Sequence, residues 1–141
     1  VMRQKIIWPV LSLALAAACV VLLVLWQGEK NRAPEIDDLR LYGMEEAHAR
    51  FSDYLRLGDE GDYWYGAAEF QTMVNCARAE NLGGMTDANA AAGVLMFNPE
   101  LAQSRLEDVC AILETCIAQP DNTAQWAVSM NELRHLLEEG N

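Results

Sequence analysis

Apolar residues form one uninterrupted run near the start of the chain. No charged residue occurs between Lys5 and Gln27, and positions 6–26 have the sequence IIWPVLSLALAAACVVLLVLW. At about 1.5 Å of rise per residue, this run spans about 30 Å as a helix, which matches the hydrocarbon thickness of a bilayer. Trp8 and Trp26 then lie near the two headgroup zones, where indole rings are favoured. The pattern predicts a transmembrane helix over 6–26.

Two processing events are alternatives to an uncleaved anchor. Arg3 and Lys5 form a basic segment, and the alanines at 16–18 offer small residues to a signal peptidase. Residues 15–19, LAAAC, also resemble the lipobox of bacterial lipoproteins. The apolar run continues through Trp26, which favours the uncleaved anchor. We therefore expect four parts: a basic N-terminal segment (1–5), the transmembrane helix (6–26), a linker (27–34) and an acidic helical domain (35–141).

Beyond the linker, apolar residues recur every three or four positions, the spacing of amphipathic helices. The first group is Ile36, Leu39, Gly43, Ala47, Phe51 and Tyr54. Three later groups are Tyr63, Ala67, Phe70, Val74 and Ala77; Leu106, Val109, Leu113 and Cys116 or Ile117; and Trp126, Met130, Leu133 and Leu137. No long stretch alternates apolar and polar residues as a half-buried strand does. The pattern predicts an all-α protein in which a small antiparallel bundle of about four helices follows the membrane helix.

Proline, glycine and small polar residues mark the expected helix ends. Pro34 should open the first helix of the domain, Gly58 should end it, and Asp62 should cap the next helix. The other expected boundaries are a short alanine-rich helix from Thr86 or Asp87 to Phe97, one helix between Pro99 and Pro120, and a last helix from Asp121 or Asn122.

The charge of the chain excludes some classes of partner. It has 10 Lys and Arg residues against 21 Asp and Glu residues, a formal net charge of -11. Nucleic acid is therefore not expected as a partner, since its phosphates would be repelled, and anionic lipid surfaces are disfavoured for the same reason. Hydrophobic residues make up 52% of the chain, which is enough to build a packed core rather than a disordered polymer.

The basic residues that flank the apolar run set the expected orientation. Arg3 and Lys5 precede it, while Lys30 and Arg32 follow it. The terminal amine tips the positive-inside count toward a cytoplasmic N-terminus. We expect a single-pass protein of the cell membrane, with the C-terminal domain outside the cytoplasm.

The two histidines suggest one metal-binding hypothesis. Each ends a Glu-x-x-His motif, Glu45 with His48 and Glu132 with His135, and paired motifs of this kind supply ligands in di-iron carboxylate bundles. Ligands of a buried centre must point into the bundle, whereas helical geometry turns Glu45, Glu132 and His135 roughly 120–180° away from the apolar stripes. We therefore predict no cofactor, with these four residues as a minority alternative.

The cysteines suggest a second chemistry. Cys110 and Cys116 are six positions apart on one expected helix, about 9 Å along its axis, so they cannot bridge each other. Cys76 could form a disulfide with either of them in an oxidising compartment. The simpler interpretation is that the cysteines pack as small hydrophobic residues.

Three consecutive aromatic residues suggest a contact surface. Tyr63, Trp64 and Tyr65 cannot all face one core on a helix, so at least one ring should be exposed. Aromatic rings are enriched at protein contacts, which makes this patch the first choice for a partner. Small residues within the apolar run, such as Ser12 with Ala16, would also permit two membrane helices to form a homodimer.

The ending MNELRHLLEE at 130–139, together with the apolar span and the acidic helical region, resembles small bacterial single-pass membrane proteins of unknown function. That resemblance implies a layout but no activity. We predict a non-enzymatic helical interaction or scaffold module that is held in the bilayer by 6–26 and binds another membrane or envelope protein. The alternative is a carboxylate and histidine metal protein, or a thiol redox protein, of the cell envelope.

Overall fold

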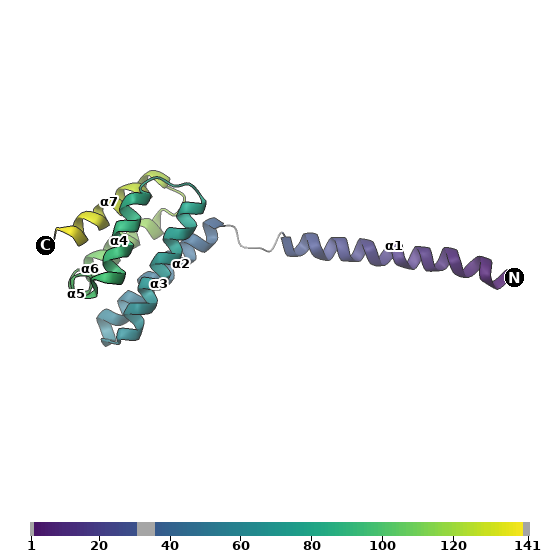
Figure 1. Cartoon of the computed structure of the whole chain (residues 1–141), viewed down its shortest axis with the longest axis horizontal. Helices are drawn as coiled ribbons and strands as arrows, with labels where there is room; N and C mark the ends of the chain where they lie inside the picture. The colour runs from purple at the N-terminus through teal and green to yellow at the C-terminus, as the bar shows by residue number, and fades with distance from the viewer. Residues whose placement is uncertain (1, 31–35, 140–141) are drawn as a thin grey trace. The chain divides into compact units, whose positions relative to one another are not determined.

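The computed structural model describes the backbone of residues 2–30 and 36–139 and the side chains of 12–28 and 37–139. These residues form helices and no strands, so the predicted all-α class is confirmed (Figure 1). The helices are α1 (Met2–Lys30), α2 (Ile36–Leu57), α3 (Glu60–Ala79), α4 (Met85–Phe97), α5 (Pro99–Ser104), α6 (Leu106–Ala118) and α7 (Thr123–Glu138).

The chain divides into two compact units, Val1–Pro34 and Glu35–Asn141. The first contains α1, a continuous helix of 29 residues that includes Gln27 and Gly28 of the expected linker. Within the described residues, no helix has both the length and the hydropathy of a membrane-crossing segment. The expected helix start at Pro34 lies outside the described residues.

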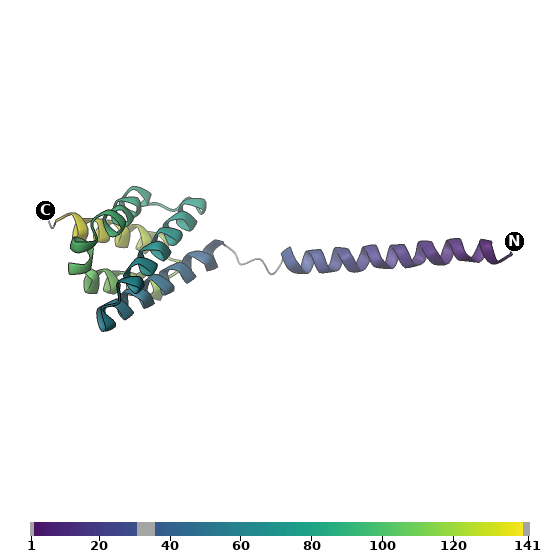
Figure 2. The same ribbon diagram turned by 60° about the horizontal axis from the view of Figure 1, so that its bottom comes forward.

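The second unit is a helical bundle built on a hairpin of α2 and α3, which lie side by side (Figure 2). Gly58 turns the chain between them with a φ of 72°, a left-handed value that glycine adopts without strain. Gly43 and Gly66 let the two helices approach closely, because a Cβ added at Gly66 would lie 2.7 Å from the ring of buried Phe51. The hairpin therefore depends on the absence of side chains at its crossing.

The helix that follows this turn begins earlier than the sequence suggests. Asp59, not Asp62, is the N-cap of α3, and its carboxylate accepts a hydrogen bond of 2.8 Å from the Gly61 amide. Asp59 has the extended backbone that an N-cap requires. The Asp62 carboxylate is instead 3.3 Å from the Arg50 guanidinium, so this acid joins α3 to α2.

The start of α4 also corrects the sequence-based prediction. Its N-cap is Gly84, with a φ of 72° and no side-chain hydrogen bond, so neither Thr86 nor Asp87 caps the helix. Asp87 instead accepts a hydrogen bond of 2.9 Å from Arg134 on α7. This ion pair joins α4 to α7, which pack against each other.

The single helix expected between Pro99 and Pro120 is divided into α5 and α6. Arg105 leaves helical geometry with φ −115° and ψ 7°, and it separates the two helices. The Ser104 hydroxyl donates a 2.6 Å hydrogen bond to the Leu101 carbonyl, a local bond that competes with helix continuation. The bundle consequently has six helices rather than about four. Of the two caps proposed for α7, Asn122 is the one used.

The core lies between these helices and largely follows the expected apolar stripes. All five stripe residues expected around α3 and all four expected on α7 are buried. On α2 the expected residues Gly43, Ala47 and Phe51 are buried, whereas Leu39 is exposed. Arg40 and Met44, which were not expected in the core, are buried beside them. Of the alternatives at the end of α6, Cys116 is buried and Ile117 is half-buried.

Candidate interaction surface

The Glu-x-x-His residues do not converge in the structure. His48 Nε2 lies 2.9 Å from a carboxylate oxygen of Glu114 on α6, while Glu45, on the same helix as His48, is exposed. Glu132 and His135 are exposed on α7. Among the side chains that the structure describes, no three histidine, cysteine or carboxylate groups are placed to hold a metal ion. The geometry offers no support for the metal alternative.

The cysteines are free thiols in the described part of the chain, and the disulfide between Cys76 and Cys110 or Cys116 is not formed. Cys110 and Cys116 are buried, and burial raises the pKa of each thiol, with hydrogen bonds to Ser52 and Ser129 respectively lowering it in part. The pKa of half-buried Cys76 is raised as well, mainly by burial. A raised pKa lowers the thiolate fraction of all three, which disfavours nucleophilic or redox chemistry at these cysteines.

Alkylation rates should reveal this burial directly. At pH 7.5 we expect iodoacetamide to modify Cys110 and Cys116 at least about tenfold more slowly in the folded protein than after denaturation, because burial covers each thiol and raises its pKa. Mass spectrometry of peptides from timed reactions measures each site, and half-buried Cys76 on α3 is the internal comparison. Equal rates at Cys110 in the folded and denatured chain would contradict this packing.

The aromatic triplet divides between the core and the surface. Tyr63 is fully buried, and its hydroxyl donates a 2.7 Å hydrogen bond to the Leu95 carbonyl on α4. Its ring lies 5.9 Å from that of Phe51 and 5.6 Å from that of Tyr54, measured between centroids. Tyr63 is therefore a core residue, and its inclusion in the predicted patch is wrong.

The other two rings of the triplet reach the surface. Trp64 is 42% exposed and packs edge-on against Tyr63, with ring centroids 5.2 Å apart. Tyr65 is half exposed, but the Arg50 guanidinium lies over its ring at 4.7 Å from the centroid. Since Arg50 already covers one face of Tyr65, Trp64 is the more available of the two.

Two further apolar residues occur at the same end of the bundle. Phe97, in the last turn of α4, is 89% exposed, and Leu57, at the end of α2, is 64% exposed. The Tyr63 contacts join the end of α2 and the start of α3 to the last turn of α4. Figures 1 and 2 both show α5 beside the α2–α3 turn, and Gln103 on α5 donates a 3.0 Å hydrogen bond to Glu60 on α3. We call Leu57, Trp64 and Phe97 the aromatic end.

Acidic residues lie close to the members of the aromatic end along the chain. Asp59 and Glu60 lie between Leu57 and Trp64 along the chain, and Glu100 follows Phe97 by three positions. The ion pairs of the described residues use other carboxylates, including Asp53 with Arg56 at 2.7 Å. None of them neutralises Asp59, Glu60 or Glu100. Exposed Arg56 precedes Leu57 but is paired with Asp53. We call Asp59, Glu60 and Glu100 the acidic border of the aromatic end.

Sequence reasoning missed a buried arginine at the opposite end of α2. Arg40 is 4% exposed; its Nε lies 2.6 Å from a carboxylate oxygen of Glu80, and its Nη2 donates a 3.0 Å hydrogen bond to the Pro120 carbonyl. The guanidinium also lies over the Trp126 ring, 5.5 Å from its centroid. The sequence held one indication of this burial: Arg40 lies four positions before Met44, so the two residues share one face of the helix. Arg40 joins α2 to the end of α3, the α6–α7 turn and α7, so its role is structural.

Comparison with known proteins adds no further assignment. No protein-family model matches the chain, and neither a curated protein nor a solved structure matches it. The resemblance to small bacterial single-pass proteins therefore stays a prediction.

Proposed function

We propose that the chain is a membrane-tethered, non-enzymatic interaction module. In this proposal α1 holds the protein in the cell membrane. The bundle over 36–139 lies outside the cytoplasm and presents the aromatic end to another membrane or envelope protein. The observation that carries the proposal is the exposure of apolar side chains along α1.

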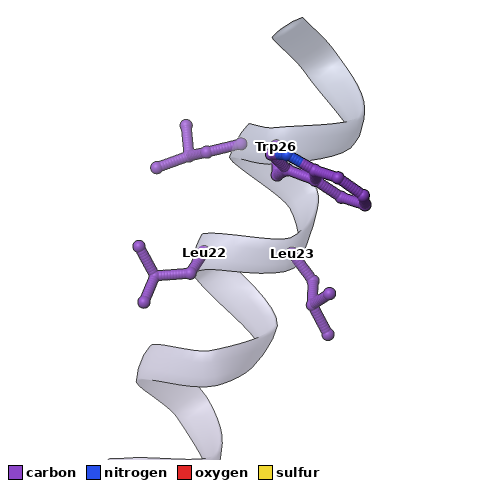
Figure 3. Close-up of a pocket in the computed structure, with 4 residues that line it drawn as sticks. Leu22, Leu23 and Trp26 are labelled. Carbon is purple, nitrogen blue, oxygen red and sulfur yellow. The ribbon is translucent and has the colours of Figure 1, made fainter. Parts of the chain in front are cut away.

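The exposed residues of α1 support a lipid environment. Large apolar side chains that are more than half exposed occupy nine positions: Leu13, Leu15, Val20, Val21, Leu22, Leu23, Val24, Leu25 and Trp26. Seven of them are consecutive, so they point in every direction around the helix. Figure 3 shows Leu22 projecting to one side of α1 and Leu23 and Trp26 to the other, from two neighbouring turns. A helix that is apolar on all sides is favoured in hydrocarbon and not in water.

The aromatic end supports the interaction role. Exposed tryptophan and phenylalanine side chains are costly in water, and such residues are enriched where proteins bind each other. Trp64 and Phe97 lie on rigid helices that the buried Tyr63 holds together. A binding surface on fixed elements loses little conformational entropy when a partner docks.

Arginines placed in α1 should release the protein from membranes. Each arginine near the middle of a membrane helix costs about 2.5–3.5 kcal/mol, so the double variant Leu15→Arg with Val21→Arg should lose most of its membrane-integrated fraction. The measurement is resistance of the full chain to alkaline carbonate extraction. Wild type is expected in the membrane pellet and the variant in the supernatant or degraded.

A matched double variant controls for the added charge. Leu39 and Val128 are exposed apolar residues of the bundle, so Leu39→Arg with Val128→Arg should leave the protein in the pellet. Extraction of the wild-type protein would overturn the tether.

Protease added to intact cells should digest the 36–139 unit, and full protection of that unit would overturn the proposed orientation.

A further inference from the structure

We infer that the occupant of the aromatic end is a basic, apolar segment of another protein. This inference rests on the proposed interaction role and adds the chemistry of the partner. It follows from the exposed apolar side chains of the aromatic end, its acidic border and the charge of the whole chain.

The apolar part of the surface calls for apolar side chains in the partner. Phe97 is the most exposed large apolar residue outside α1, and it extends from the last turn of α4 just before the chain turns at Asn98. Leu57 and Trp64 present further apolar area on the neighbouring hairpin. Aromatic and leucine side chains of a partner segment would cover these three residues and exclude water from them.

The acidic border calls for positive charge around that apolar centre. Glu60 already uses one carboxylate oxygen for Gln103, and Asp59 uses one for the Gly61 amide. Glu60 also forms a hydrogen bond with Tyr54, but neither Glu60 nor Asp59 is paired with a cation among the described residues. Exposed Glu100 forms no ion pair with the described residues either. Lysine or arginine side chains at the edge of a docked segment would neutralise these groups and raise its association rate.

The same charges disfavour two other occupants. A second copy of this chain carries the same net charge of -11 and would bring Asp59, Glu60 and Glu100 toward an equally negative surface. Anionic lipid headgroups would be repelled for the same reason. A basic protein segment is the occupant that satisfies both the apolar centre and the acidic border.

Site-specific photocross-linking in the cells that make the full-length protein tests this inference. Phe97→p-benzoylphenylalanine places the reactive ring where a phenylalanine is already almost fully exposed, so the fold should be unchanged. We expect one recurrent adduct whose cross-linked peptide carries more Lys and Arg than Asp and Glu and includes apolar residues. The same residue at Val128, an exposed position on α7, should not give that adduct.

Charge variants make the test specific. Adding Glu60→Gln and Glu100→Gln should lower the adduct yield at position 97 by about fivefold, because two border charges are lost. Glu45→Gln with Glu132→Gln removes the same number of exposed carboxylates elsewhere on the bundle and should leave the yield unchanged.

Several outcomes would overturn the inference: no adduct, an acidic or uncharged peptide, a second copy of the chain, a lipid, or a yield that does not respond to the border variants. An adduct to a single acidic protein segment would support the interaction role but would contradict a basic partner. Extraction of the wild-type protein by carbonate would contradict the membrane tether. It would not bear on the interaction role or on the basic partner.

Discussion

Replacing Arg40 with methionine is expected to destabilise the bundle by about 3–5 kcal/mol, because the change leaves a largely buried carboxylate without its cation. The Arg40 and Glu80 side chains are only 5% and 10% exposed, so water cannot replace the lost ion pair. The Pro120 carbonyl loses a hydrogen bond in the same variant. Urea denaturation of the full chain in a mild detergent, followed by circular dichroism, measures the loss of unfolding free energy.

A second substitution distinguishes an orphaned charge from lost packing. Arg40→Met with Glu80→Leu removes both charges, so it should recover most of the stability lost in the single variant. A double variant as unstable as Arg40→Met alone would contradict the ion-pair explanation. Leu39→Met, at the exposed neighbouring position, should change stability by less than about 0.5 kcal/mol.

The pH dependence of the unfolding free energy gives a further test of the Glu80 environment. Burial, followed by a hydrogen bond with Asp37, raises the Glu80 pKa above its ordinary value of 4.5, although Arg40 acts in the opposite direction. A raised folded-state pKa means that the folded protein binds the proton more tightly than the unfolded chain. The stabilising contribution of Glu80 to the free energy of unfolding should therefore be fully present below pH 4.5. It should be lost as the pH rises through the folded-state pKa. Glu80→Gln should remove that part of the pH dependence.

Gly66→Ala should destabilise the bundle by up to about 2 kcal/mol, although alanine is the better helix former. The new Cβ would lie 2.7 Å from two ring atoms of Phe51, a fully buried side chain that has little room to move. Overpacking of this kind costs about 1–3 kcal/mol, and the gain of about 1 kcal/mol in helix propensity offsets it only in part. The midpoint of urea unfolding measures the net effect.

Gly93→Ala is the matched control for this substitution. Gly93 lies within α4, and a Cβ there would meet no atom within 4 Å. Its replacement should stabilise the protein by about 0.5–1 kcal/mol through helix propensity alone. If both variants were stabilised, the α2–α3 crossing would be looser than the structure shows.

The sequence predicted the helical class and most core positions because those depend on local periodicity. The stripes beginning at Tyr63 and Trp126 are buried as expected. The boundaries were less predictable, since Asp59 and Asp62 are both acceptable caps and only the packing against Arg50 decides between them. The break at Arg105 had no glycine or proline to indicate it. Arg40 was missed because a charged residue is ordinarily assigned to the solvent face, and its partners come from distant parts of the chain.

The candidate surface was predicted only in part for a related reason. Three adjacent aromatic residues indicated that some ring must be exposed, but helical spacing alone could not select Tyr63 as the buried one. Leu57 and Phe97 are separated from Trp64 by 7 and 33 positions in the sequence, and only the packing of α2, α3 and α4 brings their elements to one end.

The packing of Trp126 also provides the molecule with an optical reporter. Its indole is 2% exposed, donates a 3.0 Å hydrogen bond to the Gly83 carbonyl and lies against a guanidinium, whereas Trp64 and Trp26 are 42% and 57% exposed. Indole emission shifts to longer wavelength when water reaches the ring. In a variant with Trp8→Phe and Trp26→Phe, which removes the indoles of the proposed membrane segment, the short-wavelength component of the fluorescence spectrum should therefore report whether α7 is docked.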